Sequence, residues 1–241
     1  VHILDVIFPK RCVGCGKIGK YFCASCTLMI RIIRVNEAIC PVCEKPAVGG
    51  ATHPKCQTRY TLDGLTSFFR YDGPVRKAVK AIKYRFVSDM ASEFVALIPE
   101  DSLFALVTLL HAKPLSSLLV PIPLHPARAR YRGFNQAEKL GALLARRLNI
   151  PTRTDILRRT RETAPQVEMK RRTDRLKNME GVFAMMQGFD KILIDQKIVK
   201  TSKLNVLLFD DVFTTGATMR NAANILKRAG AKYVWAVTMA R

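Results

Sequence analysis

Short apolar runs alternate with stretches of helical periodicity in most of the chain beyond residue 60. The runs at 65–71, 118–125, 205–209 and 231–239 are continuously apolar or weakly alternating, which is typical of buried strands. Between them, apolar residues recur at helical spacing in 74–86, 91–98, 136–148 and 219–228. Strands that alternate with amphipathic helices predict an α/β fold, in which a parallel sheet is flanked by helices.

Four other segments are less regular. The apolar stretch 101–114 fits either a helix or a connector, while 191–198 fits a strand and 27–35 a short helix. Segment 152–186 is rich in basic residues and has little apolar periodicity, so it is either a functional loop or a disordered insert. Asn135 stands directly before 136–148 and is predicted to cap that helix.

The N-terminal part of the chain is organised by cysteine rather than by periodicity. All seven cysteines lie before residue 57; six form C-x-x-C pairs, and Cys56 follows His53 at the same spacing. Four such knuckles predict two tetrahedral zinc sites, paired sequentially or interleaved. Sequential pairing gives Cys12, Cys15, Cys23 and Cys26 for one site, and Cys40, Cys43, His53 and Cys56 for the other. The composition changes at 57–63, so we divide the chain into a zinc module at 1–60 and an α/β domain at 61–241.

Three alternatives to zinc account for clustered cysteines. Disulfides need an oxidising compartment, and the N-terminus carries Asp5 early and lacks the basic-then-apolar design of a secretion signal. A redox dithiol needs one pair beside a βαβ unit rather than three pairs in succession. Knuckles can also lose their metal, but here all eight positions hold good ligands. We therefore expect structural zinc in two closed sites, and we expect the metal to drive folding of this short segment.

The charge of the chain is strongly positive. Its 241 residues carry a formal net charge of +21, which predicts attraction to polyanions such as nucleic acid or phosphorylated ligands. A solvated basic surface that aids solubility is the alternative. No apolar run is long enough to span a membrane, so we expect a cytoplasmic protein without membrane insertion.

The stretch 205–218 carries the most specific chemistry. A buried strand ends in two acids, Asp210 and Asp211, which lie where open α/β sheets bind ligands and can accept hydrogen bonds from a ribose diol. A loop of hydroxyls and glycine then enters a helix, whose first N–H groups suit a phosphate. The predicted phosphate cradle consists of Thr214, Thr215, Gly216, Ala217 and Thr218. This combination predicts a sugar phosphate site, and an ordinary strand-to-helix turn with surface acids is the alternative.

A second polar segment follows the strand at 118–125. Arg128, Arg130 and Arg132 alternate there and can clamp a pyrophosphate through bidentate hydrogen bonds, or can simply form a basic surface loop. The basic face of the helix at 74–86 has two similar interpretations, because it is either solvated or lies beside a phosphate-binding cleft.

Two resemblances connect these features. The segment 205–218 closely resembles the signature with which type I phosphoribosyltransferases bind 5-phosphoribosyl 1-pyrophosphate (PRPP). Residues 120–126 (VPIPLHP) and 132–136 (RGFNQ), the cysteine-rich N-terminus and the final strand with Ala240 and Arg241 resemble the ComF family of competence proteins. The resemblance covers essentially the whole chain. It implies a double zinc ribbon before a type I phosphoribosyltransferase-like domain, with a mobile loop within 152–186 that closes over the reacting centre.

The resemblance also implies roles for the site residues. Asp210 and Asp211 would hold the ribose hydroxyls, the loop 214–218 would hold the 5-phosphate, and the segment near Pro123 would be the pyrophosphate loop. Mg²⁺ would accompany PRPP and stabilise the leaving pyrophosphate. Both acids are thus the catalytic candidates of a glycosyltransferase acting on PRPP.

Three functions fit these features. The first is a phosphoribosyltransferase. The second is a factor that binds single-stranded DNA during DNA uptake in natural transformation, with a helicase as its partner, and that keeps the fold without catalysis. The third is a regulator that senses PRPP without turnover. The signature describes the donor pocket and not the acceptor.

Overall fold

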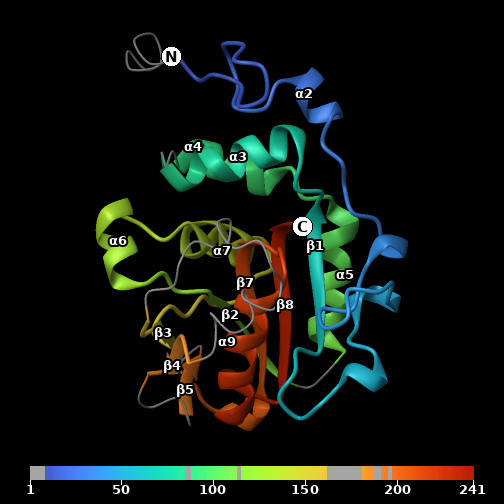
Figure 1. Ribbon diagram of the computed structural model, residues 1–241, viewed down its shortest axis with the longest axis vertical. Coiled ribbons are helices and arrows are strands. Elements are labelled where there is room, and N and C mark those ends of the chain that lie inside the picture. The colour runs from blue at the N-terminus through green and yellow to red at the C-terminus, as the bar shows by residue number, and fades with distance from the viewer. Residues whose placement is uncertain (1–8, 85–87, 113–114, 162–180, 187–190, 195–196) are drawn as a thin grey trace.

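A four-stranded parallel sheet forms the centre of the protein (Figure 1). The computed structural model describes residues 9–84, 88–112, 115–161, 181–186, 191–194 and 197–241. The strands are ordered β1 (Gly64–Phe69), β8 (Tyr233–Ala240), β7 (Leu204–Val212) and β2 (Ser116–Pro121). Each neighbouring pair is parallel, so all four carboxyl ends meet at one edge of the sheet. The predicted α/β fold with a parallel sheet flanked by helices is confirmed.

Both faces of this sheet are buried, as expected for parallel strands. Successive residues of β7 alternate between two cores: Leu207 and Phe209 pack in one, and Val206 and Leu208 in the other. Helix α7 (Gln136–Arg147) contacts β2 and β7 in the first core, and α9 (Ala217–Arg228) contacts β7 and β8 in the second.

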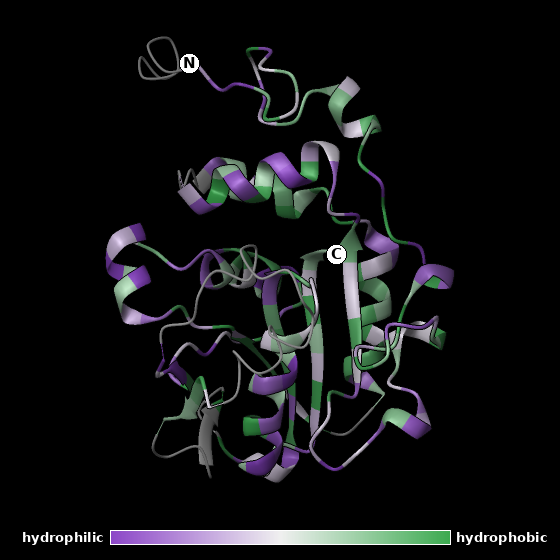
Figure 2. Ribbon diagram, in the orientation of Figure 1, coloured by the Kyte–Doolittle hydropathy of each residue, from purple (hydrophilic) through white to green (hydrophobic). Residues whose placement is uncertain are grey.

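Further helices complete the first layer. They are α3 (Gly73–Tyr84), α4 (Ser88–Ala96) and α5 (Glu100–His111), so the segment predicted as a helix or connector is a helix. Figure 2 shows α3 striped with hydrophilic and hydrophobic residues; most of its apolar residues are buried, whereas Arg76, Lys77 and Lys80 are exposed. Asn135 caps α7 as predicted, since its Oδ1 accepts a hydrogen bond of 3.0 Å from the N–H of Ala137.

Two small two-stranded sheets lie outside the main sheet. Strands β3 (Leu157–Arg159) and β4 (Phe183–Met185) pair antiparallel, and so do β5 (Lys191–Ile194) and β6 (Lys197–Lys200). The prediction of one strand at 191–198 was wrong, because this segment turns back on itself. Of the predicted loop 152–186, residues 162–180 lie outside the described residues, and the two ends pair as β3 and β4.

The cysteine-rich segment packs across one end and one side of the sheet (Figure 1). The helix predicted at 27–35 is wrong: α2 (Ala24–Leu28) is shorter, and Ile32 then bridges Phe69 at the end of β1. Three short 3-10 turns follow: η1 (Val35–Glu37), η2 (Val48–Gly50) and η3 (Pro54–Cys56). The β-branched Ile32 and Ile33 favour extended backbone, and pairing with the sheet decides between the two conformations.

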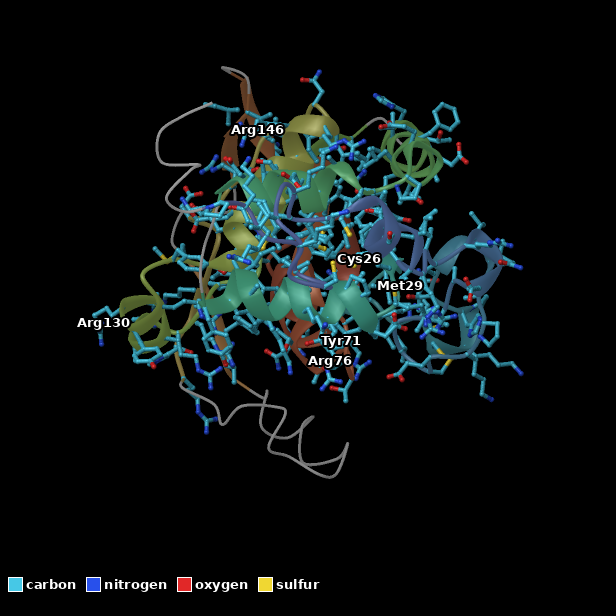
Figure 3. All side chains as sticks on the ribbon, turned by 90° about the horizontal axis from the view of Figure 1, so that it is seen from above. Cys26, Met29, Tyr71, Arg76, Arg130 and Arg146 are labelled. Carbon is cyan, nitrogen blue, oxygen red and sulfur yellow. The ribbon has the colours of Figure 1, made fainter. Side chains whose placement is uncertain are left out.

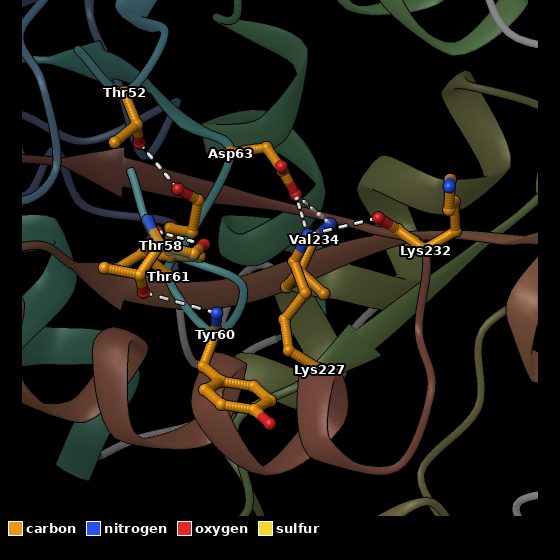
Figure 4. Close-up of polar contacts among 9 residues, drawn as sticks. Thr52, Thr58, Tyr60, Thr61, Asp63, Lys227, Lys232 and Val234 are labelled. Atoms are coloured by element: carbon orange, nitrogen blue, oxygen red, sulfur yellow. Dashed lines mark hydrogen bonds and ion pairs between the residues drawn. The ribbon is translucent and has the colours of Figure 1, made fainter. Parts of the chain in front are cut away.

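The second half of this segment is joined to β1. Ala51 bridges Gly64, and the Thr52 hydroxyl donates a hydrogen bond of 2.6 Å to the Leu62 carbonyl (Figure 4). The division of the chain at residue 60 remains a prediction.

Within the described part of the chain, no single helix has the length and apolar character to cross a membrane. The pair 89–96 and 100–111 passes by length and composition only when taken together, and it is bent by 81°.

Candidate phosphate-binding and metal sites

The eight predicted metal ligands gather into two clusters. Their ligand atoms all lie within 4.8 Å of one another in each cluster, which supports sequential rather than interleaved pairing. The first cluster contains Cys12, Cys15, Cys23 and Cys26, and the second contains Cys40, Cys43, His53 and Cys56.

The clusters fit structural zinc. A tetrahedral Zn²⁺ with Zn–S bonds of about 2.3 Å holds its sulfurs roughly 3.8 Å apart, and the Sγ atoms of Cys15 and Cys23 are separated by 3.7 Å. In the second cluster, His53 Nδ1 lies 3.3 Å from Cys43 Sγ. Its Nε2 lies 2.9 Å from the Pro46 carbonyl, the kind of partner that orients a metal-binding imidazole. Both sites have four protein ligands and are therefore of the closed, structural kind.

The backbone around the first cluster also favours thiolate ligands. The N–H of Cys23 donates to Cys12 Sγ at 3.5 Å. Desolvation by itself would raise the pKa of Cys12, but the N–H groups of Cys23, Cys15 and Gly14 outweigh it and lower that pKa to about 6. A Cβ on Gly14 would lie 2.5 Å from Cys26 Sγ, so only glycine fits between these ligands.

The two predicted acids lie on the last residues of β7, at the carboxyl edge of the sheet. The strand continues through Val212, so both acids are held by the sheet rather than by a turn. Asp211 is buried and forms an ion pair of 2.8 Å between its Oδ2 and Lys83 Nζ. Asp210 accepts a hydrogen bond of 2.8 Å from the N–H of Asp211 through its own Oδ1.

These contacts set unusual protonation behaviour. Burial and the adjacent Asp211 carboxylate raise the pKa of Asp210 to about 8, against the opposing influence of Lys83. Burial alone would lower the pKa of Lys83, but the Asp211 and Asp210 carboxylates outweigh it and the pKa is raised. At neutral pH, the site therefore contains a neutral Asp210 beside an ammonium group that interacts with Asp211.

The loop after β7 is built as the sequence predicts. Gly216 has φ +68° and caps α9. The N–H of Arg220 donates to the Gly216 carbonyl at 2.8 Å, which is the first hydrogen bond of this helix. A Cβ on Gly216 would lie 2.4 Å from the Phe213 ring, so a side chain is excluded twice, by space and by backbone conformation. The loop thus leads directly into the N-terminus of a helix of 12 residues, which favours an anion.

Thr215 has an unusual environment in this loop. Its side chain is buried, and its Oγ1 has no hydrogen-bond partner among the described residues. A buried hydroxyl without a partner costs free energy unless something else binds it. Thr214 is exposed, while Ala217 is buried and Thr218 half-buried in the first turn of α9.

The three predicted arginines lie on a helix rather than in a loop. They lie on α6 (Pro126–Arg132), a short helix missed by the sequence interpretation. Because each helical residue turns by about 100°, Arg128 and Arg132 share one side of α6 while Arg130 points elsewhere. Figure 3 shows Arg130 directed away from the body of the molecule. Their pyrophosphate role remains a prediction, in which Arg128 and Arg132 are the pair on one side of α6.

Two residues of the site were missed. Lys83 is one of several basic residues on α3, and only the packing of α3 over β7 distinguishes it. Arg220 is the other: its guanidinium donates to the Thr215 carbonyl in the loop and, at 2.7 Å, to the Pro41 carbonyl beside Cys40.

Comparisons with known proteins bear on the zinc module and on the chain as a whole. A family model described as a double zinc ribbon domain matches residues 3–57. The chain is 28% identical to competence protein ComFC of Bacillus subtilis over 223 residues, which cover 86% of this chain and 78% of that protein. It is 28% identical to DNA utilization protein YhgH of Escherichia coli K12 over 221 residues, or 87% of this chain and 86% of the relative.

Competence protein F of Haemophilus influenzae is 29% identical over 131 residues, 54% of this chain and 53% of that protein. These relatives confirm the resemblance to the ComF family.

Proposed function

We propose that this chain, a relative of competence proteins over most of its length, binds PRPP or a related ribose phosphate at the end of β7. One juxtaposition carries the proposal: the acid pair on β7 is followed within a few residues by a phosphate-type loop, in which the buried Thr215 hydroxyl has no partner among the residues that the structure describes. A 5-phosphate in the loop would supply the missing acceptor for that hydroxyl. The ribose diol would then lie against Asp210 and Asp211.

The chemistry of the donor suits these groups. In phosphoribosyl transfer, a lone pair of the acceptor bonds to C1 of the ribose while the C1–O bond breaks and its electrons leave with pyrophosphate. Mg²⁺ supplies positive charge to that pyrophosphate when it is bound. Protein groups that hold the diol and the 5-phosphate position C1 for this reaction. A neutral Asp210 can donate a hydrogen bond to one ribose hydroxyl while Asp211 accepts from the other.

The biological role is proposed from the relatives. Homologues named as competence proteins and as DNA utilization proteins support a role in competence and DNA uptake. Within that role we propose phosphoribosyltransferase activity. The alternative is a regulator that senses PRPP in the same pocket without turnover. Pyrophosphate release with candidate acceptors separates the two.

Calorimetric titration of PRPP with Mg²⁺ tests the site. We expect saturable binding to the wild-type protein and at least about tenfold weaker binding to Asp210→Asn/Asp211→Asn, because hydrogen bonds to charged groups contribute roughly 1.5–3 kcal/mol. Circular dichroism of both proteins establishes that the double variant is folded. If the folded double variant binds PRPP with the affinity of the wild type, neither acid belongs to the binding site.

A specific surface favours a second candidate function, the binding of single-stranded DNA. Tyr131 is 92% exposed on α6 between Arg130 and Arg132, and Tyr84 is 76% exposed at the end of α3. The ion pair of Lys83 places that end of α3 near the carboxyl end of β7, and α6 follows β2 at the same edge. Exposed aromatic rings among cations are what single strands need, because the rings stack on bases while the cations contact phosphates.

Fluorescence anisotropy with a labelled oligo(dT) tests this surface. We expect Tyr131→Ala to weaken binding by about 1–3 kcal/mol, the contribution of one stacked base, and affinity to fall steeply with salt. Phe104→Ala is a matched control, since Phe104 is 73% exposed on α5, which carries the acids Glu100 and Asp101 in its first turn. If both variants lose the same affinity for oligo(dT), the ring on α6 does not form a specific binding surface. A helicase is the protein partner that we propose for this activity.

A further inference from the structure

We propose that Arg220 connects the second metal cluster to the phosphate loop, so that zinc in this cluster is required for tight binding of the ribose phosphate. The inference deepens the proposed function and rests on it. It assigns a positioning role to a residue that touches neither the metal nor the ligand.

One guanidinium joins the two sites. Its Nη1 donates to the Pro41 carbonyl at 2.7 Å, and its Nη2 donates to the Thr215 carbonyl. Pro41 directly follows the ligand Cys40, which is fully buried, and it lies inside the knuckle that Cys43 completes. The direction of the Pro41 carbonyl therefore depends on the conformation of that knuckle, which a closed zinc site would fix.

The other end of the contact lies at the centre of the loop. Thr215 carries the buried hydroxyl that we assign to the 5-phosphate, and its carbonyl is the group that Arg220 holds. A Cβ on Gly216 would come within 2.7 Å of Arg220 Nη1, so the guanidinium also packs directly on the glycine. Because Arg220 is half-buried, both hydrogen bonds are partly shielded from water and are stronger than surface contacts.

The first metal cluster provides an internal comparison. Its described contacts run to the first helical layer: Lys77 on α3 donates to the Gly14 carbonyl at 2.6 Å, and the N–H of Tyr21 donates to Glu93 on α4 at 3.1 Å. Loss of its zinc should therefore disturb α3 and α4 before the phosphate loop. The two clusters have similar ligands, but loss of zinc from each should affect the phosphate loop differently.

Hydrogen exchange of the ligand-free protein tests the connection without PRPP. We expect the amides of 214–218 to exchange faster in Arg220→Gln and in Cys43→Ser, and to keep wild-type protection in Cys15→Ser. Arg228→Gln is the control on the same helix, because the contacts described for the Arg228 guanidinium lie away from the phosphate loop and the second cluster: it donates to Asn224 Oδ1 at 2.8 Å and lies over the Tyr60 ring. Zinc analysis should give one metal fewer per chain in Cys43→Ser and in Cys15→Ser. Cys43→His replaces one ligand by another and should retain both metals and the wild-type protection.

Calorimetric titration with PRPP and Mg²⁺ then measures the effect on binding. Arg220→Gln and Cys43→Ser should each weaken affinity about tenfold, and the double variant should be no weaker than either alone, since both break one connection. Additive losses, or normal loop protection in Cys43→Ser, would overturn the proposal. If the wild-type protein fails to bind PRPP, the proposed function fails, while the exchange experiment still decides the connection.

Discussion

The ammonium group of Lys83 lies 2.8 Å from Oδ2 of Asp211 and joins helix α3 to the carboxyl end of strand β7. The two side chains are 27% and 6% exposed, so this ion pair is largely removed from water. Lys83 is therefore not part of a merely solvated basic face. It is the counter-ion that allows two adjacent carboxyl groups to remain at the carboxyl edge of the sheet.

Replacing Lys83 by Met should destabilise the protein by about 3–5 kcal/mol, because Asp211 is left as an uncompensated buried charge. Chemical denaturation at neutral pH measures the change. Lys80→Met is the matched control on the same helix, and since Lys80 is exposed we expect a change within about 0.5 kcal/mol. Similar losses in both variants would show that the ion pair contributes nothing specific.

The raised pKa of Asp210, about 8, makes stability depend on pH in an unusual direction. Between the ordinary aspartate value of about 3.9 and pH 8, the folded protein binds more protons at this site than the unfolded chain. The contribution of Asp210 to the free energy of unfolding therefore falls as pH rises through this window and then levels off.

Asp210→Asn removes this titration. We expect the stability of the variant relative to wild type to increase from pH 4 to pH 8, by an amount on the order of a few kcal/mol. Urea denaturation across this range gives the difference directly. A difference that stays constant with pH would mean that Asp210 titrates normally.

Gly216→Ala should be more damaging than an ordinary glycine substitution. Besides its φ of +68°, a Cβ there would meet the Phe213 ring at 2.4 Å and Arg220 Nη1 at 2.7 Å. We expect a loss of at least about 2 kcal/mol in stability, together with loss of PRPP binding. Gly133→Ala separates the two causes, because Gly133 has φ +79° with no atom nearby, so only backbone strain of about 1 kcal/mol applies.

A second buried ion pair holds the junction between the zinc module and the sheet. Lys227 Nζ lies 2.7 Å from Asp63 Oδ2, the side chains are 8% and 10% exposed, and the same oxygen accepts the N–H of Val234 at 2.7 Å (Figure 4). Lys227→Met should cost about 3–5 kcal/mol by thermal or chemical denaturation.

The double variant Asp63→Asn/Lys227→Met should recover much of that loss, since it removes the unpaired charge and keeps an acceptor for Val234. A double variant that is less stable than Lys227→Met would assign the effect to packing.

The sequence predicted those parts of the protein whose physics is local. Residues 205–218 specify their own strand, glycine turn and helix, and Asn135 specifies its own cap, so each appears where expected. The knuckles were predicted for the same reason, because the two ligands of each knuckle are only three positions apart in the chain.

The missed features depend on tertiary packing. Nothing local distinguishes Lys83 from Lys80, or Arg220 from Arg228, until α3 lies over β7 and Pro41 lies beside α9. Extended pairing of Ile32 with Phe69 likewise prevents the predicted helix at 27–35 from continuing beyond Leu28. The helix that carries the alternating arginines was not predicted, because α6 is short and has almost no apolar periodicity.

The affinity of Thr215→Val for PRPP with Mg²⁺ tests the central claim most directly. Valine keeps the shape of threonine and removes a hydroxyl that has no partner among the described residues, so stability should be unchanged or slightly increased. If the hydroxyl binds the 5-phosphate, calorimetric titration should show binding at least about tenfold weaker than wild type. Wild-type affinity in Thr215→Val would contradict the assignment of this loop as the phosphate site.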